Sequence, residues 1–332
     1  MDFGAAISTA REGLFYPEGF ASRGSFVEVA KKAEELGFAC LWGNDHITTQ
    51  GYIKARGEHP NFFEPMITFS HLSAVTKKIK FGTAVVVGPT RHPVTLAKQA
   101  ITLDHLSSGR FLLGVGLGAY REEFEAFGGR GNRGEILDEM TEGLALLFGR
   151  NVPASYSGKH FRFKDVEMMP RPYTNPFPFY IGGNSPNVLT RVGKYAEGWI
   201  PASMSASDLE KFVPIIAETA REHKRNPSKI AVAPESICGI DRDPKVARKK
   251  FLDSPVYRHL ISLKDSTLKD IPLTDDELVS RNFIGTPAEV IKKLEPYEGA
   301  GATQVWFDFL GSTNGEVLAQ MELFAKEVMP SF

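Results

Sequence analysis

The sequence has few cysteines, no excess of one charge and no long hydrophobic run. Its 332 residues include two cysteines, Cys40 and Cys238, which lie in apolar stretches and form no CxxC pair. We therefore expect two buried reduced thiols and exclude a disulfide framework. Lys and Arg number 39 against 40 Asp and Glu. Nucleic acid and anionic membranes attract a basic excess, so we expect neither as a partner.

Signals for membrane insertion, export and several kinds of catalysis are also missing. No apolar run reaches the ~18 residues of a membrane span, and the N-terminus lacks a basic-then-apolar leader. We expect a cytoplasmic protein. The histidines show no H-E-x-x-H spacing and the chain has no G-x-S-x-G elbow. The sequence therefore predicts neither a metal site nor a serine nucleophile.

The most informative stretch that is present runs from Phe81 to Gly118. It reads as an apolar strand, a Gly-Pro loop, a helical pattern and a second apolar strand. A strand–helix–strand unit with short connections is the repeat of parallel α/β folds. Both strands end in glycine and small residues, where a ligand can approach the backbone closely. Folds of this kind bind ligands at the carboxyl ends of their strands.

Eight strand candidates alternate with helical patterns along the chain. They are residues 2–7, 38–42, 81–87, 111–117, 179–181, 198–200, 230–240 and 303–309. Eight such units favour an α/β fold of the (β/α)8 TIM-barrel type over an open sheet. We expect one domain over residues 1–332, with insertions near 44–63, 154–178 and 253–282. The segment 154–178 alternates like a hairpin.

A glycine-rich turn after the fifth strand is the clearest candidate site. Gly182 and Gly183 follow the strand, Asn184 or Ser185 can cap the next helix, and Pro186 suits its first turn. The free N–H groups of such a helix N-terminus favour an anion, and glycines allow a phosphate to approach. A capped helix without a ligand is the alternative.

The segment Gly114–Gly118 has the spacing G-x-G-x-G and not G-x-G-x-x-G. It lacks the acidic residue that follows a dinucleotide fingerprint, so we exclude a Rossmann nicotinamide site. We interpret its glycines as a strand end without side chains, against which a planar group can lie. Asp45 and His46 close the second strand. A histidine at such a position acts as acid, base or hydrogen-bond donor, or is simply a loop residue with a satisfied partner.

At this point the sequence resembles the bacterial-luciferase-like oxidoreductase family, also called luciferase-like monooxygenases. The resemblance rests on four ordered blocks, AEELGFACLWGNDH (33–46), FGTAVVVGPTRHPVTLAKQAITLDHLSSGRFLLGVGLGAYREEFEAFG (81–128), FYIGGNSPNVLTRVGKYAEGWIP (179–201) and FIGTPAEVIKKLEPYEGAGATQVWF (283–307). It implies a (β/α)8 barrel with a flavin-type cofactor at its carboxyl face and a non-proline cis peptide at Ala84–Val85.

The resemblance also assigns the site residues. It implies catalytic roles for His46, as proton donor or acceptor, and Asp45, which orients the loop. The ring of the cofactor would lie over the third-strand end and its phosphate against the turn after the fifth strand. The expected cofactor contacts are Thr83, Ala84, Val85, Gly116, Gly118, Ile181, Gly182, Gly183, Asn184 and Ser185.

The family divides by cofactor. One branch uses FMN, usually supplied reduced by a partner reductase, and another uses the deazaflavin coenzyme F420. The RHPVTLAKQ, SSGRFLLGVG and GGNSP blocks favour coenzyme F420 and hydride transfer with a small organic substrate. The alternatives are an FMN-dependent monooxygenase and a flavin-binding barrel without turnover. A flavin or F420 reductase partner and a homodimer are implied. Sugar-phosphate dehydrogenases of the F420 branch carry Glu where this chain has Ala119, which argues against that substrate.

Overall fold

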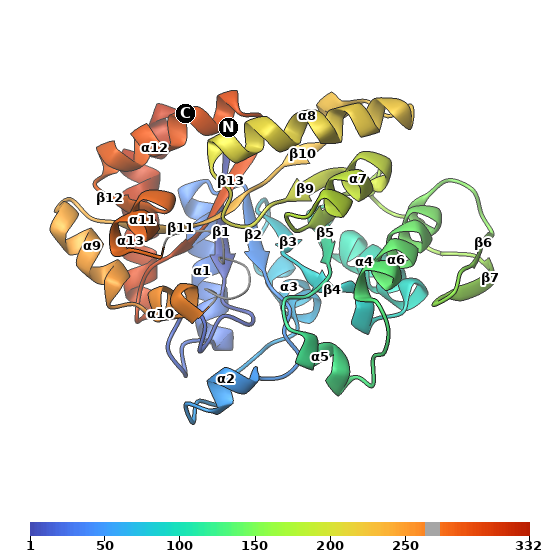
Figure 1. The fold of residues 1–332 in the computed structure, drawn as a ribbon, viewed down its shortest axis with the longest axis horizontal. Coiled ribbons are helices and arrows are strands. Elements are labelled where there is room, and N and C mark those ends of the chain that lie inside the picture. Colours follow the sequence, from blue (N-terminus) through green and yellow to red (C-terminus); the bar gives the residue numbers. More distant parts are fainter. Residues whose placement is uncertain (263–272) are drawn as a thin grey trace.

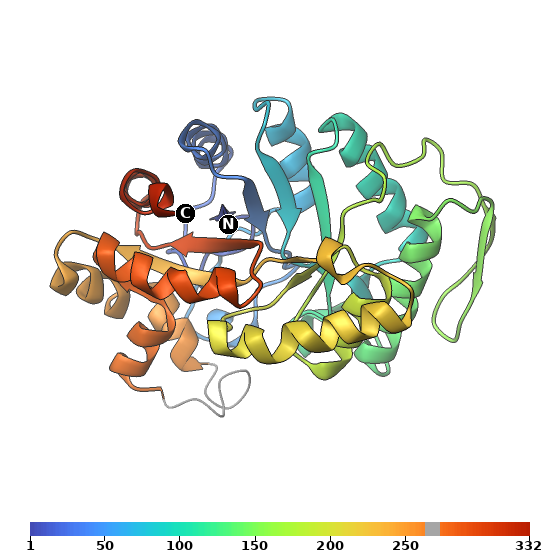
Figure 2. The same cartoon turned by 90° about the horizontal axis from the view of Figure 1, so that it is seen from above.

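The computed structural model describes residues 1–262 and 273–332 and contains a closed barrel of parallel strands (Figures 1 and 2). The predicted α/β barrel is confirmed. The strands of the ring are β1 (Asp2–Ile7), β2 (Cys40–Gly43), β3 (Lys80–Thr83) with β4 (Val86–Val87), β5 (Phe111–Gly116), β8 (Phe179–Gly182), β9 (Gly198–Ile200), β10 (Ala231–Val232) with β11 (Glu235–Ile240), and β13 (Gln304–Phe309).

The ring closes through one continuous segment, Ala231–Ile240. Its first part, β10, pairs in parallel with β9, and its second part, β11, pairs in parallel with β13. β13 in turn pairs with β1, which completes the circle. Because every ring strand is parallel to its neighbours, all their carboxyl ends meet at one mouth of the barrel.

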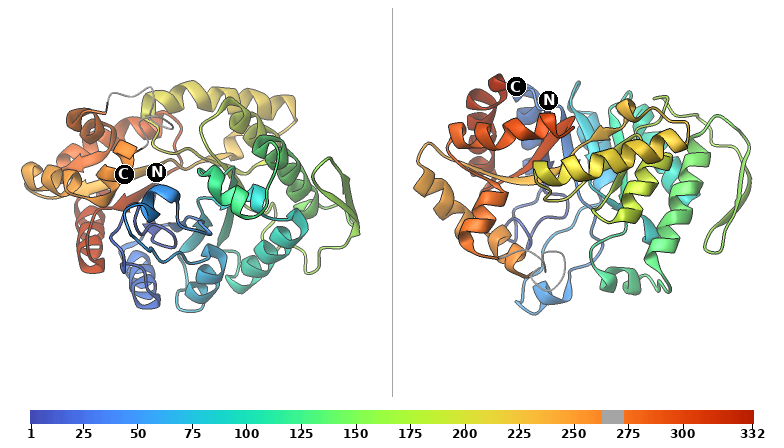
Figure 3. Two further views of the ribbon diagram at one scale, coloured as in Figure 1. Left: turned by 60° about the horizontal axis from the view of Figure 1, so that its bottom comes forward. Right: turned by 45° about the horizontal axis from the view of Figure 1, so that its top comes forward.

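Helices surround the ring, and shorter helical segments lie between them and at the ends of the strands (Figure 3). The surrounding helices are α1 (Arg23–Leu36), α3 (Pro65–Ser73), α4 (Pro93–Leu106), α6 (Arg133–Phe148), α7 (Pro186–Tyr195), α8 (Ala206–Glu222), α12 (Pro287–Gly299) and α13 (Asn314–Glu327). The others are α2 (Gly51–Lys54), α5 (Arg121–Ala126), α9 (Pro244–Leu252), α10 (Pro255–Ser262), α11 (Asp275–Arg281) and the 3-10 turns η1 (Gly88–Thr90), η2 (Pro227–Lys229) and η3 (Met329–Ser331).

The segments expected as insertions take three forms. Residues 44–63 carry only the short α2. Residues 154–178 contain β6 (Ala154–Ser157) and β7 (Arg162–Val166), an antiparallel hairpin that projects from the barrel in Figure 1. Residues 253–282 hold α10 and α11, while part of this insertion, 263–272, lies outside the described residues. Directly after it comes an unpredicted strand, β12 (Phe283–Gly285), which pairs with β11 outside the ring.

The interior of the barrel is filled by aromatic side chains. The indoles of Trp42 and Trp306 stack with centroids 5.7 Å apart, and Tyr180 meets Trp42 edge-on at 5.9 Å. Glycines face them, because a Cβ at Gly82 would collide with the Trp42 ring and one at Gly198 with the Tyr180 ring. The barrel is therefore a packed core and not a channel, and a ligand is restricted to the mouth.

This packing predicts that Gly82→Ala destabilises the fold by about 1–3 kcal/mol, because the methyl overpacks the Trp42 ring. Gly315→Ala is the matched control, since its Cβ would meet open space at the start of α13. Urea unfolding of both variants measures the difference. Equal midpoints for the two variants would contradict this account of the core.

Candidate active site

A cavity of about 580 Å³ opens at the carboxyl ends of the ring strands. Its floor includes Ala84 and Val85, both partly exposed and joined by a cis peptide, as expected from the family resemblance. Val85 occupies the centre of the mouth between two glycines. A Cβ at Gly116 would lie 2.5 Å from Val85 Cγ2, and a Cβ at Gly182 would collide with Val85 Cγ1. These glycines therefore make room for the Val85 side chain.

The residues predicted to contact a cofactor fall into two groups. Those that line the cavity are Ala84, Val85, Gly118, Gly182, Gly183 and Asn184. Thr83, Gly116, Ile181 and Ser185 lie outside the lining. Thr83 is fully buried, and its hydroxyl donates to Gly114 O at 2.8 Å and accepts from Gly114 N at 2.9 Å. It joins β3 to β5 beneath the floor.

The turn from Gly182 to Ser185 is held by its asparagine. Asn184 Nδ2 donates to Ala202 O at 2.8 Å, and Asn184 Oδ1 accepts from Ala202 N at 3.0 Å. Ser185 stands at the N-cap position of α7, but its side chain accepts no capping hydrogen bond. The first turn of this ten-residue helix thus lacks a side-chain cap and carries no acidic residue. Pro186 has no N–H, and those of Val188 and Leu189 donate to Ser185 O, which leaves the N–H of Asn187 for an anion beside the cavity.

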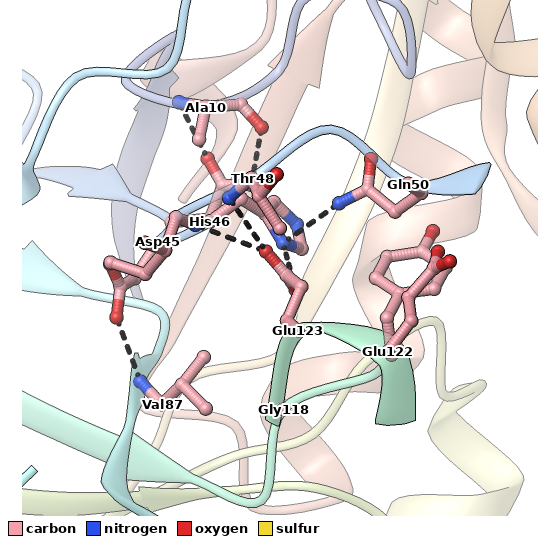
Figure 4. A network of polar contacts seen from close by, with 12 residues as sticks. Ala10, Asp45, His46, Thr48, Gln50, Val87, Gly118, Glu122 and Glu123 are labelled. Atoms are coloured by element: carbon pink, nitrogen blue, oxygen red, sulfur yellow. Dashed lines mark hydrogen bonds and ion pairs between the residues drawn. The ribbon is translucent and has the colours of Figure 1, made fainter. Parts of the chain in front are cut away.

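His46 is the polar side chain best placed for proton transfer (Figure 4). Its Nδ1 lies 2.9 Å from Oε2 of Glu123, which is 3% exposed and also accepts from Ile47 N at 3.0 Å. A carboxylate only accepts, so Nδ1 carries the proton and Nε2 is left to act as acid or base. His46 lines the cavity. Glu123 comes from α5, 77 residues further along the chain, and the sequence analysis missed it.

Asp45 is fully engaged by its neighbours. Its Oδ2 accepts from Arg91 Nη1 at 2.6 Å and from Val87 N at 2.9 Å, and Oδ1 accepts from Arg91 Nη2 at 3.1 Å. The side chain is fully buried. This bidentate pair ties the end of β2 to β4 and to the turn η1, which positions His46 one residue further on.

A second polar network adjoins His46, whose ring lies 5.5 Å from that of Tyr120 between centroids. Tyr52 Oη lies 3.2 Å from Tyr120 Oη and 3.1 Å from His259 Nδ1, which joins the segments that carry α2, α5 and α10. Burial, together with the nearby Arg11, lowers the pKa of His259 to about 4, so its imidazole is neutral at physiological pH. Tyr120 and His259 line the cavity. No sequence motif marks these three residues.

Other kinds of site find no support in the part of the chain that the structure describes. Within residues 1–262 and 273–332, no three His, Cys, Asp or Glu side chains gather as metal ligands do. None of the described helices is long and apolar enough to cross a membrane. A closed barrel with a histidine–carboxylate pair in a cavity at its strand ends is the arrangement of a TIM-barrel enzyme.

Comparison with known proteins then gives the family. Residues 1–304 match the luciferase-like monooxygenase family model, and the chain belongs to that family. A 5,10-methylenetetrahydromethanopterin reductase of Methanopyrus kandleri is 27% identical over 341 residues, covering 91% of this chain and 93% of the reductase. An alkanal monooxygenase alpha chain of Photorhabdus luminescens is 25% identical over 362 residues, covering 99% and 97%. The solved monooxygenase RslO1 of Streptomyces bottropensis shares the fold, with a TM-score of 0.82 at 22% identity, covering 100% and 99%.

The lowered pKa of His259 predicts a pH-dependent stability. Between pH 6.5 and about 4 the unfolded chain binds a proton at His259 that the folded chain does not, so stability falls as the pH falls. The share due to this residue is about 2–3 kcal/mol at pH 4.5. Urea unfolding at pH 7 and pH 4.5 should show a smaller loss for His259→Gln than for the wild type. If the free energy of unfolding falls equally with pH in the wild type and in His259→Gln, the lowered pKa is not that of His259.

Proposed function

We propose that the protein is a coenzyme F420-dependent oxidoreductase that exchanges hydride with a small organic substrate. The observation that carries the proposal is the His46–Glu123 pair, 2.9 Å apart, at the wall of a cavity whose floor is Val85. The family includes both F420-dependent enzymes and monooxygenases. An FMN-dependent monooxygenase is the second candidate, because the alkanal monooxygenase relative covers nearly the whole chain.

The residues present fit a planar phosphorylated cofactor. Val85 provides an apolar surface at the mouth, and Gly182 and Gly183 leave backbone uncovered beside it. The positive end of α7, with the N–H of Asn187, would hold a phosphate, and Asn184 would keep that turn in place through Ala202. The cofactor would supply the hydride-exchanging ring.

His46 would move the proton that accompanies hydride transfer. When the substrate is an alcohol, His46 Nε2 accepts the hydroxyl proton; when it is a carbonyl, the imidazolium returns one to the oxygen. The buried carboxylate of Glu123 contacts Nδ1 and so fixes the orientation of the imidazole. Asp45 acts as a positioning residue, since its oxygens are already bound by Arg91 and Val87.

The charges that line the cavity favour the phosphate diester of F420 over the phosphate monoester of FMN. The FMN phosphate is a monoester that carries nearly two negative charges, whereas the F420 phosphate is a diester with one. Among the described lining residues the arginines are Arg11 and Arg281, and each is already paired with a carboxylate. Asp208 adds a negative charge to the same wall. Helix N–H groups alone suit the single charge better. A reductase partner and a homodimer stay predictions.

Fluorescence titration of the purified chain with F420 and with FMN tests the cofactor. We expect F420 to bind at least about tenfold more tightly. Gly182→Ala should weaken F420 binding, because the methyl displaces Val85, while Gly315→Ala should leave it unchanged. Tighter binding of FMN than of F420 would refute the F420 assignment and favour the monooxygenase.

The role of Glu123 is tested by Glu123→Gln, which keeps a hydrogen-bond acceptor for His46 but removes the charge. We expect kcat for F420 turnover with the best substrate of an alcohol, enone and carbonyl panel to fall about 10- to 100-fold. Glu122→Gln is the matched control, since Glu122 is exposed and accepts from Gly51 N outside the pair. Equal kcat values for the two variants, or normal turnover by His46→Ala, would remove the acid–base role.

A further inference from the structure

A buried charged cluster outside the His46 pair also borders the cavity. It consists of Arg11, which follows β1, Glu235, which begins β11, and Asp308 near the end of β13. Arg11 Nη2 lies 2.7 Å from Glu235 Oε1, and Arg11 Nη1 lies 3.3 Å from Asp308 Oδ2. The side chains of Arg11 and Asp308 are 5% and 2% exposed, and that of Glu235 is 18% exposed. Neither the proposed proton transfer nor the cofactor uses them.

The positive charge of the Arg11 guanidinium is already compensated by carboxyl groups within this cluster. Arg11 faces two carboxylates, and the ring of Phe15 covers it at 4.4 Å from the centroid. Burial raises the pKa of Asp308, Arg11 opposes this rise, and the neighbouring Glu235 carboxylate adds to it. The cluster is thus neutral when Asp308 is protonated and negative when it is not.

Hydrogen bonding within the cluster is incomplete. Arg11 Nε and both oxygens of Asp308 are buried and have no hydrogen-bond partner among the described residues. Glu235 lines the cavity as well as contacting Arg11. An ionised carboxylate offers about four acceptor positions, so Glu235 retains acceptor capacity toward the cavity.

The cavity that Glu235 lines exposes mostly apolar surface, to which Leu14, Phe15, Ile237 and Leu260 contribute. An acceptor in a mostly apolar cavity orients a ligand that presents a hydrogen-bond donor and an apolar body. An anion would find no free cation there, because the lining cations of the described chain, Arg11 and Arg281, are both ion-paired.

We infer that Glu235 anchors the substrate: it accepts a hydrogen bond from a hydroxyl or ammonium group on an apolar molecule, and the cluster excludes carboxylates and phosphates from this part of the cavity. The inference rests on the proposed function and deepens it by naming the substrate class. Glu235 is assigned to binding and specificity, whereas His46 keeps the proton transfer.

Three matched probes test the inference: cyclohexylmethanol, cyclohexylmethylammonium and cyclohexanecarboxylate. Calorimetric titration at pH 7 into the chain, with and without F420, measures their Kd. We expect the hydroxyl probe, the ammonium probe or both to bind at least about tenfold more tightly than the carboxylate. Preference for the ammonium probe identifies a charged donor, and preference for the hydroxyl probe identifies a neutral one. Equal or tighter binding of the carboxylate overturns the inference.

Glu235→Gln supplies the second arm. It should weaken the ammonium probe at least about tenfold and reduce discrimination against the carboxylate. Glu210→Gln removes an exposed carboxylate on α8 and should leave all three affinities unchanged. If the three probes keep the same order of affinity in Glu235→Gln, the inference is overturned. If this variant fails to fold, the order of affinity on the unaltered chain decides. F420 titration of the same samples separates the two proposals. If F420 does not bind, the proposed cofactor is contradicted, whereas the role of Glu235 is judged from the probe affinities alone.

Discussion

The packing of aromatic rings against glycines inside the barrel is the constraint on which the rest of the structure depends. Trp42 on β2 and Trp306 on β13 flank β1, and their rings need the missing Cβ atoms of Gly4 and Gly82 to fit. With the interior filled, the strands keep a fixed radius and a ligand has access only at the mouth. Each strand then serves as a rigid support for the residue that follows it.

Polar side chains at the mouth are fixed by partners from other loops. Asp45 is bound by Arg91, His46 by Glu123 and Asn184 by Ala202. Each pair links two different strand–helix connections. Such cross-links hold reactive groups in one orientation before a ligand arrives, which reduces the reorganisation that binding or catalysis requires.

The sequence predicts the barrel and one residue of each hydrogen-bonded pair at the mouth. Asp45, His46 and the turn at Gly182 follow apolar strands, and position relative to a strand is a local signal. Their partners carry no such signal. Glu123 lies 77 residues from His46, and Tyr52 lies 207 residues from His259, so only the closed ring brings them together. β12 was missed because three residues are too few to show a period.

The hydrogen bonds of Tyr52 to Tyr120 and His259 have an evolutionary consequence. They join three loops that lie far apart in the chain but share one wall of the cavity. Grafting any single loop from a relative would leave a phenol or an imidazole without its counterpart. Changes of substrate range in this lineage are therefore expected to proceed by compensated substitutions across the three loops, so that these positions covary among close homologues.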